Sequence, residues 1–217
     1  MGKLNLNGPV KLTDYILPVL CFIASWAIGG WFYSQMPAEV PVHWGLNGQP
    51  DRFGSRFEGA FAVPIILTLL TIMFAFLSRT RAGRLMLACA WITGLFMIAI
   101  QYVIGINSLG VGVDVGRFVM LSMAGLFLAL GFIVPMMPQN RWGGFRNSYT
   151  LSDMRVWQST NKLGGRMLLL TGLLIIPLAF APPLVSFVAS FVVITVCIVV
   201  VPMFHSMKHY RQLKGQH

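Results

Sequence analysis

Six long apolar stretches, separated by polar segments, set the pattern of residues along this chain. They cover residues 15–33, 60–77, 85–106, 118–136, 167–181 and 184–204. A helix of about 20 mostly apolar residues is long enough to cross the hydrocarbon core of a bilayer. The pattern therefore predicts an all-α polytopic membrane protein with about six transmembrane helices.

The fifth apolar stretch is the shortest, and Pro182 and Pro183 separate it from the sixth. A Pro-Pro pair readily ends one helix and begins another, which predicts a plain helical hairpin. A broken, re-entrant hairpin is the alternative at this point.

Composition supports a membrane protein. Of the 217 residues, 56% are hydrophobic and only 10% are charged, with a mean hydropathy of +0.73. Soluble domains carry about a quarter charged residues. We therefore expect residues 1–217 to form a single integral membrane domain. Cys21, Cys89 and Cys197 all lie within apolar stretches and have neither the spacing of a zinc site nor a disulfide framework, so no cofactor or metal is expected.

Basic residues give the chain a formal net charge of +10, and their positions predict its orientation. They gather in the N-terminus, in the second and fourth loops and in the C-terminus. The positive-inside rule places these segments, and so both termini, in the cytoplasm. This accounts for the charge without a nucleic-acid partner. We expect a multi-pass protein of the bacterial cytoplasmic (inner) membrane, with the basic tail 205–217 lying against anionic lipid of the bilayer.

The middles of the predicted spans contain no Asp, Glu, Lys, Arg or His. Ion-coupled transporters usually place such groups at depth, so a small-molecule transporter is only an alternative. Gln101 is expected to make helix–helix hydrogen bonds, and Gly94, Gly125 and Gly131 are expected to allow helices to pack closely.

The long loop 34–59 is predicted to be an ordered extracytoplasmic segment. Asn47-Gly48 is typical of a tight turn, and residues 40–44 before it are expected to be extended. His43 and nearby carboxylates could in principle bind a metal. A lone histidine among turn residues more often holds a loop by hydrogen bonds, so no metal site is assigned.

The long loop 138–166 is predicted to be cytoplasmic and to contain a short interfacial helix. Thr150 or Ser152 could cap this helix, and Gly164-Gly165 would end it. Trp157 would anchor it at the membrane interface.

Together the two loops resemble the SdpI family, the immunity proteins for the sporulation-delaying toxin and their relatives. The outer motif covers residues 36–55 and includes Val-Pro-Val-His-Trp-Gly and Asp-Arg-Phe-Gly-Ser. The inner motif covers residues 140–165 and includes Gly-Gly-Phe-Arg, Thr-Leu-Ser and a final Gly-Gly. Two departures stand out. Residues 147–149 are Asn-Ser-Tyr where the family usually has Thr-Pro-Trp, and Asn161 replaces a frequent histidine.

The resemblance implies a protein that protects its host from a secreted, membrane-active peptide toxin. It also implies that the protein holds a cytosolic DNA-binding repressor at the membrane. On this basis the ligand-binding candidates in the outer loop are His43, Asn47, Asp51 and Arg52. The partner-binding candidates in the inner loop are Arg146, Thr150, Trp157 and Asn161.

A membrane enzyme acting on lipid or peptide at the interface is the other alternative. Its candidate groups would be His43 with Asp51, or Arg146 with Asn161. The chain contains no Ser/His/Asp set, zinc motif or glycine-rich phosphate loop, so no catalytic residue is assigned.

The order of spans and loops suggests a 3+3 inverted repeat. The chain divides into spans 1–3 and 4–6, and three spans per half would give the halves opposite orientations. A long loop follows the first span of each half, and a Trp-Gly pair lies in both loops.

Overall fold

The computed structural model describes residues 8–215. A short 3-10 turn, η1 (Leu12–Tyr15), leads into helix α1 (Ile16–Gln35). The other long helices are α2 (Arg56–Leu77), α3 (Gly83–Ser108), α4 (Val115–Ile133) and α6 (Met154–Leu178). A last rod is made of α7 (Pro183–Ile194), a π-helical stretch η3 (Thr195–Val200) and α8 (Val201–Lys214).

Within the described residues, six helical segments of 22 to 32 residues are long and apolar enough to cross a membrane. This confirms the predicted all-α, six-span protein. Less than half of the most apolar window of each segment is buried inside the molecule, so much apolar surface faces outward. A lipid environment suits such a surface. The chain is a multi-pass membrane protein.

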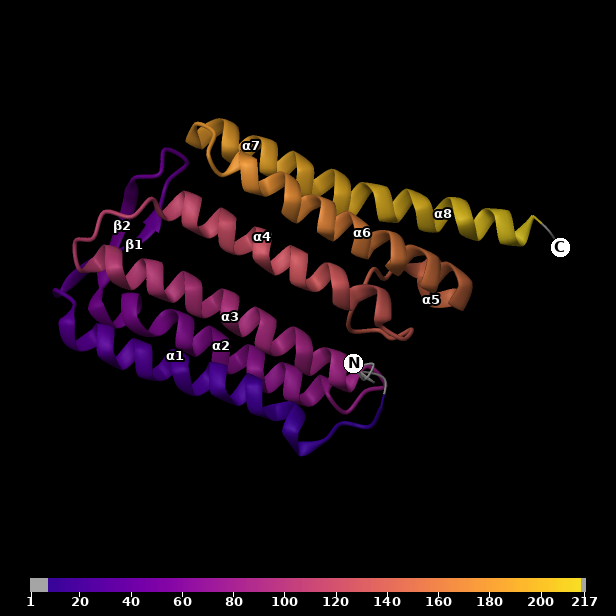
Figure 1. Ribbon diagram of the computed structural model, residues 1–217, viewed down its shortest axis with the longest axis horizontal. Helices are drawn as coiled ribbons and strands as arrows, with labels where there is room; N and C mark the ends of the chain where they lie inside the picture. Colours follow the sequence, from indigo (N-terminus) through magenta and orange to yellow (C-terminus); the bar gives the residue numbers. More distant parts are fainter. Residues whose placement is uncertain (1–7, 216–217) are drawn as a thin grey trace, which may run out of the picture.

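The helices form two groups that meet along α3 and α4 (Figure 1). Helices α1, α2 and α3 each pack against the other two. In the second group, α4 packs on α6, and α6 packs in turn on the α7–α8 rod. The inverted repeat stays a prediction.

The two ends of the bundle differ in character (Figure 1). We call one end the hairpin end: it carries strands β1 (Glu39–Trp44) and β2 (Pro50–Ser55) and the turns at 109–114 and 179–182. We call the other the basic end: it carries residues 78–82, the segment 137–153 with helix α5 (Ser148–Ser152), and both ends of the described chain.

Buried polar and small residues join the first three helices, as the sequence predicts. The Ser25 hydroxyl donates to Gln101 Oε1 at 2.7 Å, and Gln101 Nε2 donates to the Ser25 carbonyl at 3.0 Å. A Cβ atom at Gly94 would lie 2.8 Å from the Cβ of Cys21, so the absence of a side chain there permits the close packing.

The glycines of α4 are not equivalent. A Cβ atom at Gly131 would lie 2.7 Å from the Leu169 side chain on α6, which confirms the predicted close contact. Gly125, in contrast, has open space where a Cβ would be. The prediction that Gly125 packs a helix contact was wrong because it lies on a face of α4 that no neighbour covers there.

Helix α6 overturns two details of the sequence analysis. It runs unbroken from Met154 to Leu178, so Gly164-Gly165 does not end a separate interfacial helix. The two glycines instead let other segments approach. A Cβ at Gly164 would lie 2.1 Å from the Phe145 ring, and one at Gly165 would lie 2.3 Å from the Pro135 ring. The fifth span is thus much longer than its apolar stretch.

The fifth and sixth spans form a plain helical hairpin. Helix α6 ends at Leu178, and Pro183 is the first residue of α7. The following rod runs for 32 residues to Lys214, so no re-entrant break is present in it. Its π-helical stretch ends two residues before Pro202, which lacks an N–H group and so cannot complete the regular bonding of the turn before it.

Candidate functional site

The hairpin of β1 and β2 is an ordered structure at its own end of the bundle. The strands pair antiparallel, with Val40 opposite Gly54 and His43 opposite Arg52. The turn between them has Gly48 at a φ of +76°, a backbone conformation that favours glycine. Asn47 Oδ1 accepts a hydrogen bond from the Gln49 N–H at 3.0 Å. The tight turn predicted at Asn47-Gly48 is confirmed.

One exposed hydrogen bond and one exposed ion pair link the polar side chains of the hairpin. His43 Nδ1 lies 2.5 Å from Asp51 Oδ1, and Arg52 Nη2 lies 2.7 Å from Glu58 Oε1. The sequence-predicted residues are therefore divided: His43 and Asp51 lie together, Arg52 contacts the start of α2, and Asn47 shapes the turn. Pairs this exposed contribute at most about 1 kcal/mol each to folding.

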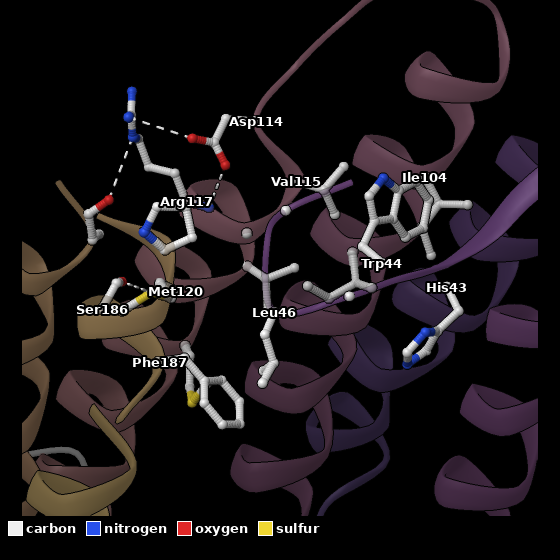
Figure 2. Close-up of a pocket in the computed structure, with 18 of the residues that line it drawn as sticks. His43, Trp44, Leu46, Ile104, Asp114, Val115, Arg117, Met120, Ser186 and Phe187 are labelled. Carbon is white, nitrogen blue, oxygen red and sulfur yellow. Dashed lines mark hydrogen bonds and ion pairs between the residues drawn. The ribbon is translucent and has the colours of Figure 1, made fainter. Parts of the chain in front are cut away.

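An apolar cavity of about 390 Å³ lies beneath the hairpin (Figure 2). Its walls come from the hairpin, the last turns of α3, the first turns of α4 and the start of α7. Its apolar lining residues include Leu46, Ile104, Val115, Met120 and Phe187. Cavities of this size bind small apolar ligands or large side chains.

Asp114 and Arg117 lie at the mouth of this cavity and join α4 to the α6–α7 turn (Figure 2). Asp114 caps α4 by accepting a hydrogen bond from the Arg117 N–H at 2.9 Å. The Arg117 guanidinium lies 3.4 Å from Asp114 Oδ2 and also donates to the Ala179 carbonyl at 3.4 Å. It lies 5.3 Å from the centre of the Phe180 ring.

A second hollow, of about 410 Å³, adjoins the apolar cavity and is more polar. The amides of Asn47, Gln49 and Asn107 line it. The two hollows share Trp44 and Asp114 as lining residues. Sequence reasoning missed Asn107, Met120 and Phe187 because each lies in or beside an apolar stretch and carries no motif.

At the basic end, the inner motif is held by buried hydrogen bonds. Asn161 is 1% exposed, and its Oδ1 accepts from the Phe145 N–H at 2.8 Å. Its Nδ2 donates to the Trp157 carbonyl at 3.0 Å. Gly144 has a φ of +85°, and a Cβ atom there would lie 2.4 Å from Asn161 Oδ1. Asn161 therefore fixes the path of the loop.

Trp157 is also buried, at 1% exposed, and its Nε1 donates to the Met137 carbonyl at 2.9 Å. It belongs to a core cluster with Leu85, Met86 and Cys89 of α3. The prediction that Trp157 anchors an interfacial helix was wrong because its indole packs between helices and its N–H group is satisfied inside the protein.

Thr150 completes the buried set. Thr150 Oγ1 accepts from the Asn147 N–H at 2.8 Å, and Asn147 Oδ1 accepts from the Thr150 N–H at 2.9 Å. This reciprocal cap begins α5, and Asn147 Nδ2 also donates to Ser206 Oγ on α8 at 2.7 Å. Of the four residues predicted to bind a partner, Arg146 is the exposed one, and it donates to the Arg141 carbonyl. Their role in binding stays a prediction.

Asp153 begins α6 by accepting a hydrogen bond from the Arg155 N–H at 2.7 Å. The Arg155 guanidinium also bonds to this carboxylate, 3.0 Å from Oδ2. Both contacts hold the pKa of Asp153 below its ordinary value, the side-chain bond most strongly. The group is therefore ionised at neutral pH, as a negative charge at a helix N-terminus favours.

Comparison with known proteins supports the resemblance seen in the two loops. Residues 136–206 match the model of the SdpI/YfhL protein family, and residues 20–68 match a domain of unknown function, DUF1648. Immunity protein SdpI of Bacillus subtilis is 24% identical over 212 residues, which cover 94% of this chain and 98% of that protein. The chain thus resembles the SdpI/YfhL family model in its last third and SdpI along nearly its whole length.

The chain also matches an uncharacterized protein of Archaeoglobus fulgidus, at 43% identity over 54 residues, 22% of this chain and 30% of that protein. No solved structure matches it significantly. The segment that matches DUF1648, residues 20–68, contains the β1–β2 hairpin, and the segment that matches the SdpI/YfhL model, residues 136–206, contains the α6–α7 turn. The hairpin and this turn lie on different sides of the apolar cavity.

Within the described residues, no three His, Cys, Asp or Glu side chains group as metal ligands would. The paired candidates for a membrane enzyme also differ in their surroundings. His43 and Asp51 lie together on the exposed hairpin, whereas Asn161 is buried and satisfied by backbone groups.

Proposed function

We propose that this chain is a bacterial immunity protein that recognises a secreted, membrane-active peptide at its hairpin end. The observation that carries the proposal is an ordered hairpin over an apolar cavity, in a chain aligned along nearly all its length with an immunity protein. In this proposal the peptide is captured at the outer surface before it can damage the membrane.

Charge supports this orientation. Arg79, Arg81, Arg141 and Arg146 lie in the loops of the basic end, together with the cationic tail of α8. The positive-inside rule puts this end in the cytoplasm of a bacterial inner membrane and the hairpin end outside. The hairpin and its cavity would then face the compartment from which a secreted peptide arrives.

The basic end is the proposed contact for a cytosolic repressor. Arg141 and Arg146 are exposed on a loop whose backbone is fixed by Asn161 and Thr150. A preorganised cationic loop can bind an acidic protein surface with little loss of loop entropy. The buried members of the inner motif would then act by holding Arg146 in position.

The proposal is tested by expressing the chain in a host sensitive to the sporulation-delaying toxin. Cells carrying the wild-type chain should grow at toxin concentrations that kill cells carrying an empty vector. His43→Ala should weaken protection because it removes the exposed group that pairs with Asp51. Equal killing of both strains, with the wild-type chain present in the membrane, would overturn the proposal.

The proposed inner role has a separate readout. A repressor that is held by the protein should sediment with membranes of wild-type cells and return to the soluble fraction with Arg146→Ala. Arg79→Ala is the matched control, since Arg79 is an exposed arginine of the same end outside the loop. If the two variants retain the repressor equally, the loop is not its contact.

A further inference from the structure

The two hollows at the hairpin end form one recess with an apolar part and a polar part. They share Trp44, Gly48, Asp114 and Pro183 among their lining residues. Their volumes are similar, about 390 Å³ and 410 Å³. A ligand that fills both must therefore be amphipathic.

The apolar part reaches down between α4 and α7. Met120 lines it from α4, and Phe187 lines it from the first turns of α7 (Figure 2). Met123 of α4 also belongs to the lining. The two helices touch where the Ser186 hydroxyl donates to the Met120 sulfur at 2.7 Å. Phe187 is 51% exposed, so its side chain forms a wall between the cavity and the outer surface of the bundle. This part suits branched or aromatic side chains.

The polar part is lined by groups that both donate and accept hydrogen bonds. Asn47 and Gln49 contribute exposed amides from the hairpin turn, and Asn107 contributes a half-buried amide from the end of α3. Asn107 Nδ2 donates to the Val103 carbonyl at 3.0 Å, which fixes the direction of its side chain. Primary amides match the N–H and C=O groups of a peptide main chain.

Charge at this end argues against an anionic lipid headgroup. The Arg117 guanidinium, which lines the apolar hollow, is already paired with the Asp114 carboxylate, and His43 Nδ1 is hydrogen-bonded to Asp51. Arg52 is likewise paired with Glu58. A phosphate group is usually bound by arginine or lysine side chains that can direct their donors to it. Neutral amide groups fit a peptide better.

We propose that the two hollows bind a single peptide segment. Its apolar side chains occupy the cavity between α4 and α7, and its adjoining main chain bonds to the amides of Asn47, Gln49 and Asn107. This inference rests on the proposed function and assigns the binding site for it. It makes Met120 and Phe187 determinants of which apolar side chain fits.

The test fills the cavity without disturbing the hairpin. Met120→Trp places a larger side chain into existing empty space, and Met73→Trp is the control because Met73 is 43% exposed on α2, outside the cavity lining. Each protein is purified whole into phosphatidylcholine nanodiscs and titrated with fluorescently labelled sporulation-delaying toxin. Met120→Trp should raise the Kd at least about tenfold, whereas Met73→Trp should leave it unchanged.

A second variant separates the polar part from the apolar part. Asn107→Ala should raise the Kd by about three- to tenfold, the usual effect of losing one hydrogen bond. It leaves the cavity volume intact, so it tests the site even if Met120→Trp is poorly folded. Protection of sensitive cells should fall in the same order as the affinities.

The outcomes distinguish the two proposals. If the wild type binds toxin and protects cells but both variants match it, the recess is not the binding site and only this inference is overturned. If the wild type neither binds nor protects, the proposed function fails with it. If native mass spectrometry finds a phospholipid that Met120→Trp releases while toxin binding is unchanged, the cavity is a lipid site and the peptide assignment is wrong.

Discussion

The two long loops of this protein are ordered by different kinds of contact. At the hairpin end, polar side chains pair at the surface, and the protein beneath them is hollow. At the basic end, Thr150, Trp157 and Asn161 are at most 1% exposed, and each has hydrogen-bond partners within the loop and α6. One loop covers a recess, and the other is part of the core.

This difference predicts that the hairpin end can rearrange around a ligand and that the basic end is rigid. Exposed pairs cost little to rearrange because water can replace their partners. Buried polar groups cannot be separated without leaving an unsatisfied donor or acceptor. A ligand could therefore adjust the hairpin, whereas the basic-end loop would keep its shape and present Arg146 from a fixed backbone.

The largest expected effect is the loss of Trp157. Trp157→Ala removes a buried indole from the cluster with α3 and leaves the Met137 carbonyl without its donor. Such truncations cost about 3–5 kcal/mol in protein cores. The free energy of unfolding in detergent micelles measures the loss.

Trp142→Ala is the matched control for that measurement. Trp142 lies at the same end of the bundle, in the segment 137–153, but is 54% exposed, so its removal should change the free energy of unfolding by at most about 0.5 kcal/mol. If the two alanine variants unfolded alike, the basic-end loop would not be part of the core, and the contrast between the ends would be lost.

A smaller effect is expected where the loop passes Asn161. Gly144→Ala places a Cβ 2.4 Å from Asn161 Oδ1, and it does so at a φ of +85°. The strained backbone alone costs about 1–2 kcal/mol, and the steric contact adds to it. Thermal unfolding of the purified variant would show the sum.

Gly110 separates these two contributions. It also has a φ of +85°, but nothing lies within 4 Å of a Cβ built there. Gly110→Ala should therefore show the backbone cost alone and unfold at a higher temperature than Gly144→Ala. Equal unfolding temperatures would show that the loop yields to Asn161 at no cost, and so is less rigid than its contacts indicate.

The sequence predicted the fold well because a bilayer restricts the choice of structure. Long apolar stretches in lipid can satisfy their backbone only as helices, so the stretches located the six spans. The predicted positions were least accurate at α6, where the first turns carry polar residues such as Asn161 and Lys162. These turns belong to the helix because they pack against the loop, which hydropathy cannot report.

The candidate site was predictable only in part. The turn at Asn47-Gly48 is a local property, and local chemistry located it. The cavity is assembled from the hairpin, α3, α4 and α7, so it depends on contacts between residues far apart in the chain. Met120 and Phe187 look like any other lipid-facing residues in the sequence. Similarly, the sequence marks Gly164 as a residue that can end a helix. It does not show that the Phe145 ring packs against Gly164 in the folded protein.

The smallest expected effect is at the hairpin itself. Arg52 and Glu58 pair 2.7 Å apart with side chains 58% and 38% exposed. Arg52→Ala, Glu58→Ala and the double variant form a cycle whose coupling should be about 0.2–1 kcal/mol in the free energy of unfolding. Raising the salt concentration should reduce this coupling further, because exposed charges are screened. A coupling of several kcal/mol that does not fall with salt would instead show that the hairpin is as rigid as the basic-end loop. A ligand would then have to enter the recess while the hairpin stays in place.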